Sequence, residues 1–277
     1  KRIFMANIRI IYDDASLRAS SIVADSTAPP TSIDNVLTEY KGQAHRSVGR
    51  SVQYTLTWSS MQTVGGVVLP ATNLSSEATI RVQLYSGVTP VGDSGTIWAC
   101  PGTDLELWNW TVPLNANAFI FGGASKSAVW FNNQVTCDKV VINLVDTTAN
   151  TAGYIDCSKI IVGGYWEPTY NVSNGINVTI SDTSSSNRNE AGDLISNRSV
   201  IFEQISFDFS VLLEADKLML SQILRKVGTS RNILVSVFPD SNSTLEQNHI
   251  IYGKRSNSTI NTELYGIYRH SMDIEGW

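Results

Sequence analysis

The sequence has no apolar run close to the roughly 18 residues that a membrane-spanning helix requires, so it predicts no transmembrane helix. It also has no block of basic residues: 20 Lys and Arg stand against 25 Asp and Glu, which gives a formal net charge of −5. Nucleic acids and anionic membranes attract proteins with concentrated positive charge. The composition therefore argues against nucleic-acid binding and against membrane insertion.

The motifs that usually carry catalysis or metal binding are missing as well. The sequence contains no CxxC, HExxH or GxSxG motif and no glycine-rich phosphate loop. Its three histidines are far apart in the chain, at His45, His249 and His270. We therefore expect a protein that is not an enzyme, with no catalytic residue, no metal and no cofactor.

Two acidic stretches come closest to a chemical site. Asp104 and Glu106 precede two tryptophans and could form the carboxylate pair of a glycosidase, but no dense cluster of acids accompanies them. Asp146, Asn150 and Asp156 offer oxygen atoms for calcium. They lack the density of a dedicated calcium loop, so a hairpin turn is the favoured interpretation of this stretch.

Cysteine is scarce, and the three cysteines have no motif spacing: Cys100, Cys137 and Cys157. One pair could form a disulfide. However, the first residues, KRIFMANIRI, lack the apolar segment of a signal peptide. Free thiols, as in a protein assembled in the cytoplasm, are therefore favoured.

Short strands of alternating polarity dominate the first part of the chain. In the segment RSVQYTLTWSS, one face carries Val52, Tyr54, Leu56 and Trp58. Similar segments follow at short intervals and are separated by turn signals, which is typical of an antiparallel sandwich rather than of α/β units. We predict a mainly β protein whose residues 1–165 form a β-sandwich of jelly-roll type.

Residues 166–277 are predicted to form a smaller β-domain with one helix. Residues 198–213 alternate like a long strand. Residues 214–227 have apolar side chains at helical spacing, with acidic residues in the first turn and basic residues in the last. Gly228 follows them and is expected to end the helix.

A polar stretch precedes this long strand. Residues 181–199 contain few apolar side chains, which indicates a long mobile loop or an arm. We expect this arm to contact a neighbouring subunit through Ser181, Asn187, Arg188 and Asn189.

Two tryptophans in the segment GTDLELWNW, Trp108 and Trp110, allow two interpretations. Indole rings can stack on the faces of sugar rings, so the pair could form a glycan-binding site. Alternatively, both rings close one end of the sandwich or lie at a subunit interface. The second interpretation is favoured.

The segment IIVGGYWEPTY marks the change between the two parts of the chain. Gly163 and Gly164 lack a Cβ, which lets the last sandwich strand turn. Pro168 biases the residue before it away from helix. Tyr165 and Trp166 are expected to pack between the domains, so the segment is predicted to be the domain joint.

Several segments, in this order, resemble one family. The segment VVLPATNLSSEATIR, from Val67 to Arg81, resembles the galactose-binding (discoidin-like) β-sandwich of tail proteins in long-tailed bacteriophages. YIDCSKIIVGGYWEPTYNVSNG looks like the exit from that sandwich, and RSVIFEQISFDFSVLLEADKLMLSQILRKVGTSRNILVSVFPD is similar to the companion domain. The resemblance covers residues 30–277.

This resemblance implies a distal or minor tail protein, that is, a structural component of a tail tip or baseplate. It implies a homo-oligomeric ring at the distal end of the tail, with the tail tube and tail hub as partners. Its location would be the virion tail, after assembly in the host cytoplasm. The resemblance supplies no catalytic residue. The rival hypothesis is an adhesin-like module of the tail that binds a glycan of the host surface.

Overall fold

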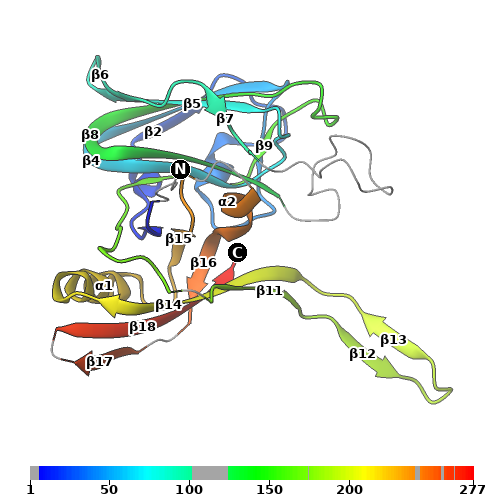
Figure 1. Ribbon diagram of the computed structural model, residues 1–277. Coiled ribbons are helices and arrows are strands. Elements are labelled where there is room, and N and C mark those ends of the chain that lie inside the picture. Colours follow the sequence, from blue (N-terminus) through cyan, green and yellow to red (C-terminus); the bar gives the residue numbers. More distant parts are fainter. Residues whose placement is uncertain (1–5, 102–123, 174, 241–243, 257–258, 265) are drawn as a thin grey trace. The chain divides into compact units, whose positions relative to one another are not determined.

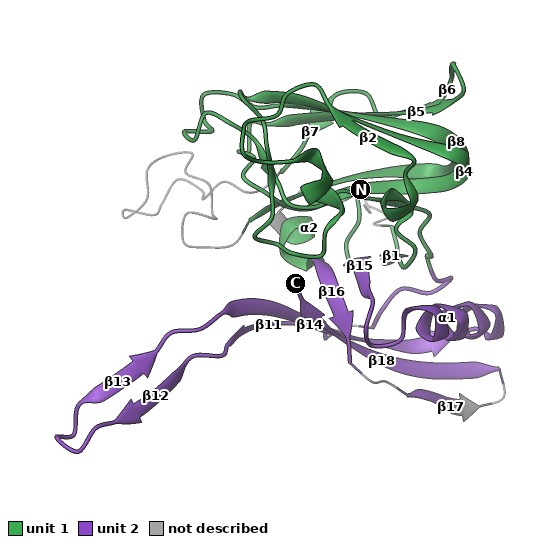
Figure 2. Ribbon diagram, turned by 180° about the vertical axis from the view of Figure 1, so that it is seen from behind, with its two compact units in different colours: residues 1–167, 236–250 green, residues 168–235, 251–277 purple. Residues whose placement is uncertain are grey.

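The computed structural model describes residues 6–101, 124–173, 175–240, 244–256, 259–264 and 266–277 (Figure 1). The protein is mainly β with antiparallel sheets and one main helix, which confirms the predicted fold class. Contacts divide the chain into two compact units (Figure 2). Unit 1 contains residues 1–167 and 236–250, and unit 2 contains residues 168–235 and 251–277.

The predicted division into domains 1–165 and 166–277 stays a prediction. The units differ from them chiefly because residues 236–250, far along the chain, belong to unit 1. This segment includes the short helix α2 (Thr244–His249). Among the described residues, no helix is long and apolar enough to cross a membrane.

Unit 1 is a β-sandwich built on a sheet with nine strands in the described residues. The strand order is β3 (His45–Arg46), β9 (Asp156–Cys157), β4 (Ser51–Thr72), β8 (Ser125–Val145), β5 (Thr79–Ser86) and β6 (Thr89–Asp93). Further pairing is made by β2 (Ser21–Ala24) and β10 (Ile161–Gly163) on β4, and by β7 (Ile97–Trp98) on β5. The unit also contains β1 (Arg9–Ile11) and the 3-10 helices η1 (Ala15–Arg18) and η2 (Ile33–Leu37).

The long strands β4 and β8 connect the layers of the sandwich. Their antiparallel pairing shifts register three times, between Thr57 and Gln62, between Val64 and Gly66, and between Leu69 and Thr72. Such bulges bend strands and let one strand take part in both layers.

The core lies between the layers, and its first strand follows the predicted alternation. The predicted inward residues Val52, Tyr54, Leu56 and Trp58 are all buried. They pack with inward residues of β5 and β8, such as Ile80, Leu84 and Ile142. The 2-residue period of apolar side chains therefore determines which face of the sheet is buried.

Unit 2 contains one sheet and the helix α1 (Glu214–Val227). Within the unit, the strand order is β15 (Asn232–Ser236), β16 (Ile250–Arg255), β18 (Ile267–Gly276), β14 (Ile201–Leu212) and β11 (Asn177–Asp182). Strand β17 (Ile260–Leu264) pairs with β18. The buried sheet residues include Ile205, Phe207, Phe209, Met272 and Ile274.

The helix α1 has the predicted bounds, but its buried stripe differs from the expected one. Leu220, Ile223 and Val227 are buried, whereas Leu218 is exposed. Asp216 is buried, and its carboxylate accepts a hydrogen bond from the backbone N–H of Thr169, at 3.1 Å. The buried stripe therefore includes one acidic residue that apolar spacing does not predict.

Residues 181–199, predicted to be a long loop or an arm, are part of a β-hairpin. Strand β12 (Ser185–Arg188) pairs with β13 (Leu194–Asn197), and this pair continues the hairpin beyond the pairing of β11 with β14. Side-chain hydroxyls link the two strands, as in Ser186 Oγ to Ser196 Oγ at 2.9 Å. We call residues 177–201 the arm. It extends from the start of β14, away from α1 and β17 (Figures 1 and 2).

Candidate ligand-binding surface

An exposed tryptophan that the sequence reasoning missed lies on the outer face of the unit 1 sheet. Trp98 of β7 is the direct partner of Thr79 on β5, and Thr79 is the direct partner of Val145 on β8. Directly opposed residues of neighbouring strands project from the same face. The side chain of Trp98 is 60% exposed and that of Val145 is 49% exposed. The row therefore presents an apolar platform to solvent.

A shallow pocket adjoins this row. It has a volume of about 470 Å³ and is lined by Thr79, Thr96, Ile97, Trp98 and Pro101. The lining combines one flat aromatic ring with small apolar groups and two hydroxyls. We call these residues, together with Val145, the Trp98 surface.

Polar side chains continue the same face of the sheet beyond Thr79. Arg81, two residues along β5, pairs with Asn143 on β8. Its Nη2 lies 2.6 Å from Oδ2 of Asp93, and Gln83 also donates to this carboxylate, at 3.2 Å. The hydrogen bond from Arg81 lowers the pKa of Asp93 to about 2. Both groups are therefore charged at neutral pH, beside a platform that is apolar.

This arrangement suits one kind of ligand. Binding sites usually combine apolar and aromatic surface with a few polar groups that fix orientation. An indole ring offers a flat apolar face together with an N–H donor. The Trp98 surface can therefore hold a small ligand that has a flat apolar face and a rim of hydroxyl groups.

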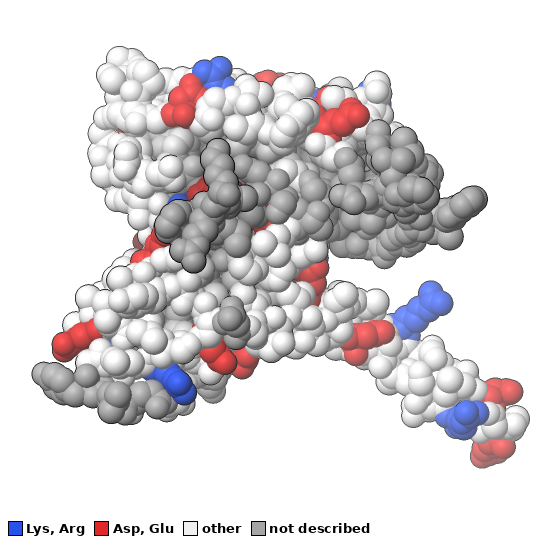
Figure 3. Space-filling model, in the orientation of Figure 1, with Lys and Arg blue, Asp and Glu red and all other residues white. Residues whose placement is uncertain are grey.

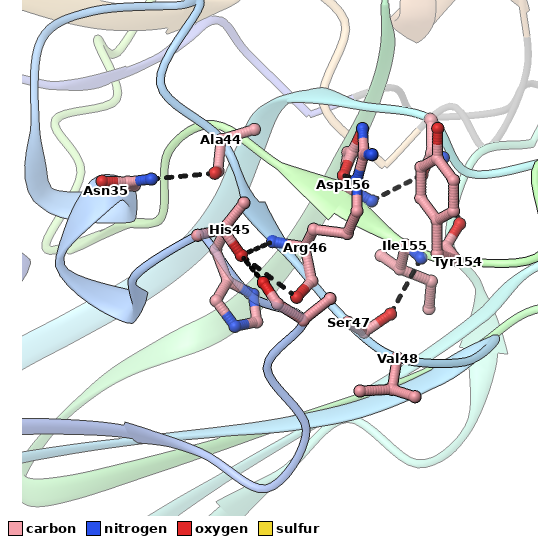
Figure 4. Close-up of polar contacts among 12 residues, drawn as sticks. Asn35, Ala44, His45, Arg46, Ser47, Val48, Tyr154, Ile155 and Asp156 are labelled. Atoms are coloured by element: carbon pink, nitrogen blue, oxygen red, sulfur yellow. Dashed lines mark hydrogen bonds and ion pairs between the residues drawn. The ribbon is translucent and has the colours of Figure 1, made fainter.

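A second polar cluster in unit 1 has a different character (Figure 4). The guanidinium of Arg46 contacts both carboxylate oxygens of Asp156, each at 2.8 Å, and lies 3.8 Å from the centre of the Tyr154 ring. Next to it, the buried imidazole of His45 contacts the hydroxyl of Tyr54, at 2.9 Å. Burial lowers the pKa of His45. These groups form hydrogen bonds with one another, and the contact between Arg46 and Asp156 links β3 to β9.

The three oxygen-bearing residues considered for calcium do not share a site. Asp156 is engaged by Arg46. The Asp146 carboxylate accepts hydrogen bonds from Ser75 N at 3.0 Å, from Ser75 Oγ, from Thr147 N at 2.8 Å and from Asn150 Nδ2 at 3.0 Å. These hydrogen bonds link the loop at Ser75 to the loop that contains Asp146, Thr147 and Asn150. The favoured turn interpretation is consistent with the positive φ of Gly153, 79°.

The sequence-predicted aromatic pair cannot be placed. Trp108 and Trp110 lie outside the described residues, as do Asp104 and Glu106. Trp98 comes ten residues before Trp108 in the sequence, and three tryptophans in so short a stretch were a signal that could have drawn attention to it. The predicted role of the pair stays a prediction.

The predicted joint residues mostly belong to unit 1. A Cβ at Gly163 would lie 2.6 Å from the carbonyl oxygen of Asp13, and one at Gly164 would lie 2.8 Å from Oε1 of Gln134. The backbone of Tyr165 bonds Gln134, at 3.1 and 2.8 Å, through its N–H and carbonyl.

Trp166 is buried, and its backbone forms a pair of 2.9 Å hydrogen bonds with Ile10. Pro168 is the first residue of unit 2. The role of these residues as a joint stays a prediction.

The four predicted contact residues of the arm are distributed along the hairpin. Ser181 belongs to β11, Asn187 and Arg188 belong to β12, and Asn189 begins the turn at the tip. Asn187 and Arg188 are exposed. Their predicted contact with a neighbouring subunit stays a prediction.

The three cysteines are buried and carry thiols rather than a disulfide, as favoured from the sequence. Burial raises the pKa of Cys100 and of Cys157 to about 12, and that of Cys137 to about 11. Because the thiolate is the reactive form, these side chains behave as small apolar groups of the core.

No model of a known protein family matches the chain, and no curated protein matches it. Among solved structures, it is similar to CpGH89CBM32-5 from Clostridium perfringens, in complex with GalNAc-beta-1,3-galactose. The identity is 8%, the match covers 55% of this chain and 100% of that one, and the TM-score is 0.38.

It is also similar to the fucose binding module SpX-3 of Streptococcus pneumoniae, with 10% identity, coverage of 56% and 99%, and a TM-score of 0.37. A chitosan-binding module from Paenibacillus sp. IK-5 has 13% identity, coverage of 55% and 99%, and a TM-score of 0.36. Likeness at this level concerns the course of the backbone, and no binding property is transferred from it.

Proposed function

We propose that the protein is a non-catalytic glycan-binding module and that the Trp98 surface is its binding site. The observation that carries this proposal is the exposed indole of Trp98 beside a pocket lined by hydroxyls. A pyranose ring has a face of C–H groups that matches a flat indole and a rim of hydroxyls that requires hydrogen-bond partners. Thr79 and Thr96 supply such partners at the pocket.

Within the part of the chain that the structure describes, binding is a better explanation of this surface than hydrolysis. A glycosidase needs a carboxyl group that stays protonated near neutral pH, together with a second carboxylate. Asp93, on the same face, has a pKa of about 2 because Arg81 donates to it. It is therefore ionised and cannot act as the general acid.

A glycan array followed by titration calorimetry tests the proposal. The first probes are galactose-, GalNAc- and fucose-terminated oligosaccharides. We expect Trp98→Ala to weaken binding at least about tenfold, which corresponds to about 1.4 kcal/mol. The matched control is Tyr40→Ala, since Tyr40 is exposed in the same unit.

Three results would contradict the proposal. These are no binding to any array glycan, equal binding by Trp98→Ala and the native protein, and equal losses in Trp98→Ala and Tyr40→Ala. A parallel assay for new reducing ends on polysaccharides separates binding from hydrolysis, and we expect no release.

A second candidate function is a structural component of a phage tail tip or baseplate, within a ring at the distal end of the tail. It is favoured by the arm, because a long exposed hairpin suits a protein that assembles with neighbours. The two functions are compatible, since a tail component can also bind a host glycan. Electron microscopy of intact tails labelled with an antibody to this chain would test the tail assignment, and tails without label would contradict it.

A further inference from the structure

The outer face of the unit 1 sheet continues beyond the Trp98 surface along β5 and β8. These two strands pair without a register shift along their whole shared length. Residues two apart on a strand project from the same face. The outward side chains of β5 are therefore those of Thr79, Arg81, Gln83 and Tyr85, and none of these four is buried. Rows of cross-strand partners at Arg81, Gln83 and Tyr85 follow the row that contains Trp98.

The row next to Trp98 carries two amide side chains. Arg81 is the direct partner of Asn143 on β8, and Asn143 is the direct partner of Gln53 on β4. Both amides are half-buried, and within the described residues neither side chain forms a hydrogen bond with the protein. Each amide offers an acceptor oxygen and a donor NH2 group. The sheet therefore holds hydrogen-bonding groups beside the Trp98 surface that solvent can reach.

The two rows beyond the amides combine apolar, hydroxyl and aromatic groups. Gln83 is the direct partner of Val141, and Val141 is the direct partner of Thr55. In the last row, Tyr85 is the direct partner of Lys139, whose ammonium lies 4.3 Å from the centre of the Tyr85 ring. A cation over one face restrains the position of such a ring. We call these rows, from Trp98 to Tyr85, the outer strip.

The outer strip is much longer than one sugar. Tyr85 lies six residues beyond Thr79 on β5, which corresponds to roughly 20 Å at about 3.3 Å per residue. The pocket beside Trp98 lies at one end of this length, and the Tyr85 ring lies at the other. A single sugar at Trp98 would leave the amide row and Tyr85 in water. A chain of several sugars would contact every row.

The charges of the outer strip are balanced within the protein. Arg81 and Asp93 form an ion pair at 2.6 Å, and Lys139 follows the acidic Asp138 in the chain. Figure 3 shows the same character on the face in view, where isolated charged groups are separated by uncharged surface. A strongly charged ligand binds where charge of the opposite sign is concentrated. The strip therefore suits an uncharged ligand.

We propose that the ligand of the outer strip is an uncharged linear polysaccharide, bound along several successive sugars from Trp98 to Tyr85. The inference rests on the proposed function, because Trp98 holds the first sugar, and it adds the class of ligand and the residues that bind the rest. Sugar hydroxyls donate and accept hydrogen bonds, as the amides of Gln53 and Asn143 do. Because paired strands hold these groups in place, little order has to be gained on binding.

Titration calorimetry with a series of chain lengths tests the proposal. The probes are cello-, β-1,4-galacto- and N-acetylchito-oligosaccharides, from the monosaccharide to the hexasaccharide. For at least one series, we expect the affinity to rise about tenfold or more between the disaccharide and the longest oligomer. Trp98→Ala should weaken binding at every length. Added salt should leave the affinity unchanged, because screening affects charged contacts.

Two variants locate the additional contacts. Tyr85→Ala should remove the gain in affinity of the long oligomers and leave disaccharide binding unchanged, because the disaccharide ends before Tyr85. Gln53→Ala/Asn143→Ala should weaken the longest oligomer about tenfold, because two hydrogen-bonding side chains are lost. The matched control is Tyr40→Ala, an exposed tyrosine of the same unit, which should bind like the native protein. Circular dichroism and melting curves establish that each variant is folded.

The proposal is overturned if affinity does not depend on chain length, or if folded Tyr85→Ala keeps the native gain. It is also overturned if oligogalacturonate, a carboxylated chain, binds more tightly than every neutral oligomer. In these cases, binding of short sugars that is lost in Trp98→Ala would still support the proposed function. Absence of binding to any sugar would contradict both.

Discussion

The hydrogen bonds around Asp146 lead to a quantitative prediction for Asp146→Ala. The substitution removes the acceptor of four hydrogen bonds, two of them from the buried residue Ser75. Asn150 keeps a bond to the carbonyl of Tyr154, at 3.0 Å, and Thr147 is exposed and can bind water. The two bonds of Ser75 therefore dominate the loss. Hydrogen bonds to a charged group contribute roughly 1.5–3 kcal/mol each, so we expect the free energy of unfolding to fall by about 3–6 kcal/mol.

Urea denaturation followed by tryptophan fluorescence measures this change in the free energy of unfolding. The control is Asp25→Ala, whose exposed carboxylate accepts one hydrogen bond from Gln53 N, at 2.8 Å. We expect the control to lose less than about 1 kcal/mol. Calcium and EDTA should leave both values unchanged.

A decrease in the free energy of unfolding below about 1 kcal/mol in Asp146→Ala would refute the conclusion that hydrogen bonds to Asp146 hold the two loops together. Stabilisation of the native protein by calcium, absent from Asp146→Ala, would show that the carboxylate binds a cation instead.

Two further predictions concern stability. Trp166→Ala should lower the free energy of unfolding by roughly 3–5 kcal/mol, because a buried indole is replaced by a cavity, and limited proteolysis should find a new cleavage site near Asn171. An unchanged melting temperature and digestion pattern would contradict the role of Trp166 as a joint. Burial lowers the pKa of His45 and of His270, so the unfolded chain takes up protons that the folded chain rejects as the pH falls below about 6.5. Stability should therefore decrease from pH 7.5 to pH 5.5, and less steeply in His45→Gln; an identical pH slope in the variant would oppose this explanation.

Regular periodicity made parts of the fold predictable. The alternation from Val52 to Trp58 identified the inner face of β4, because one sheet face is buried and the other is not. The bounds of α1 followed from its charged ends and from Gly228, whose φ of 62° suits glycine. The inner face of β4 and the bounds of α1 are both determined by neighbouring residues in the sequence, so they could be predicted without knowledge of long-range contacts.

Other features depend on contacts that local sequence does not reveal. The strands of the arm were not predicted because Ser, Thr and Asn usually favour turns, whereas here their side chains form hydrogen bonds across the hairpin. Trp98 was missed because a strand of two residues, Ile97 and Trp98, has no period to detect. Its position on the outer face of the sheet depends on pairing with Thr79. The two residues are far apart in the sequence and become neighbours only in the folded chain.

The continuity of β14 gives the arm a mechanical property. The same strand forms one side of the arm at Ile201 and pairs with β18 as far as Leu212. Hydrogen bonds of an antiparallel ladder are perpendicular to the strands. Tension applied along the arm therefore shears the whole ladder at once rather than opening it one bond at a time. An arm anchored in this way can transmit pulling force to the sheet of unit 2 without first peeling away from it.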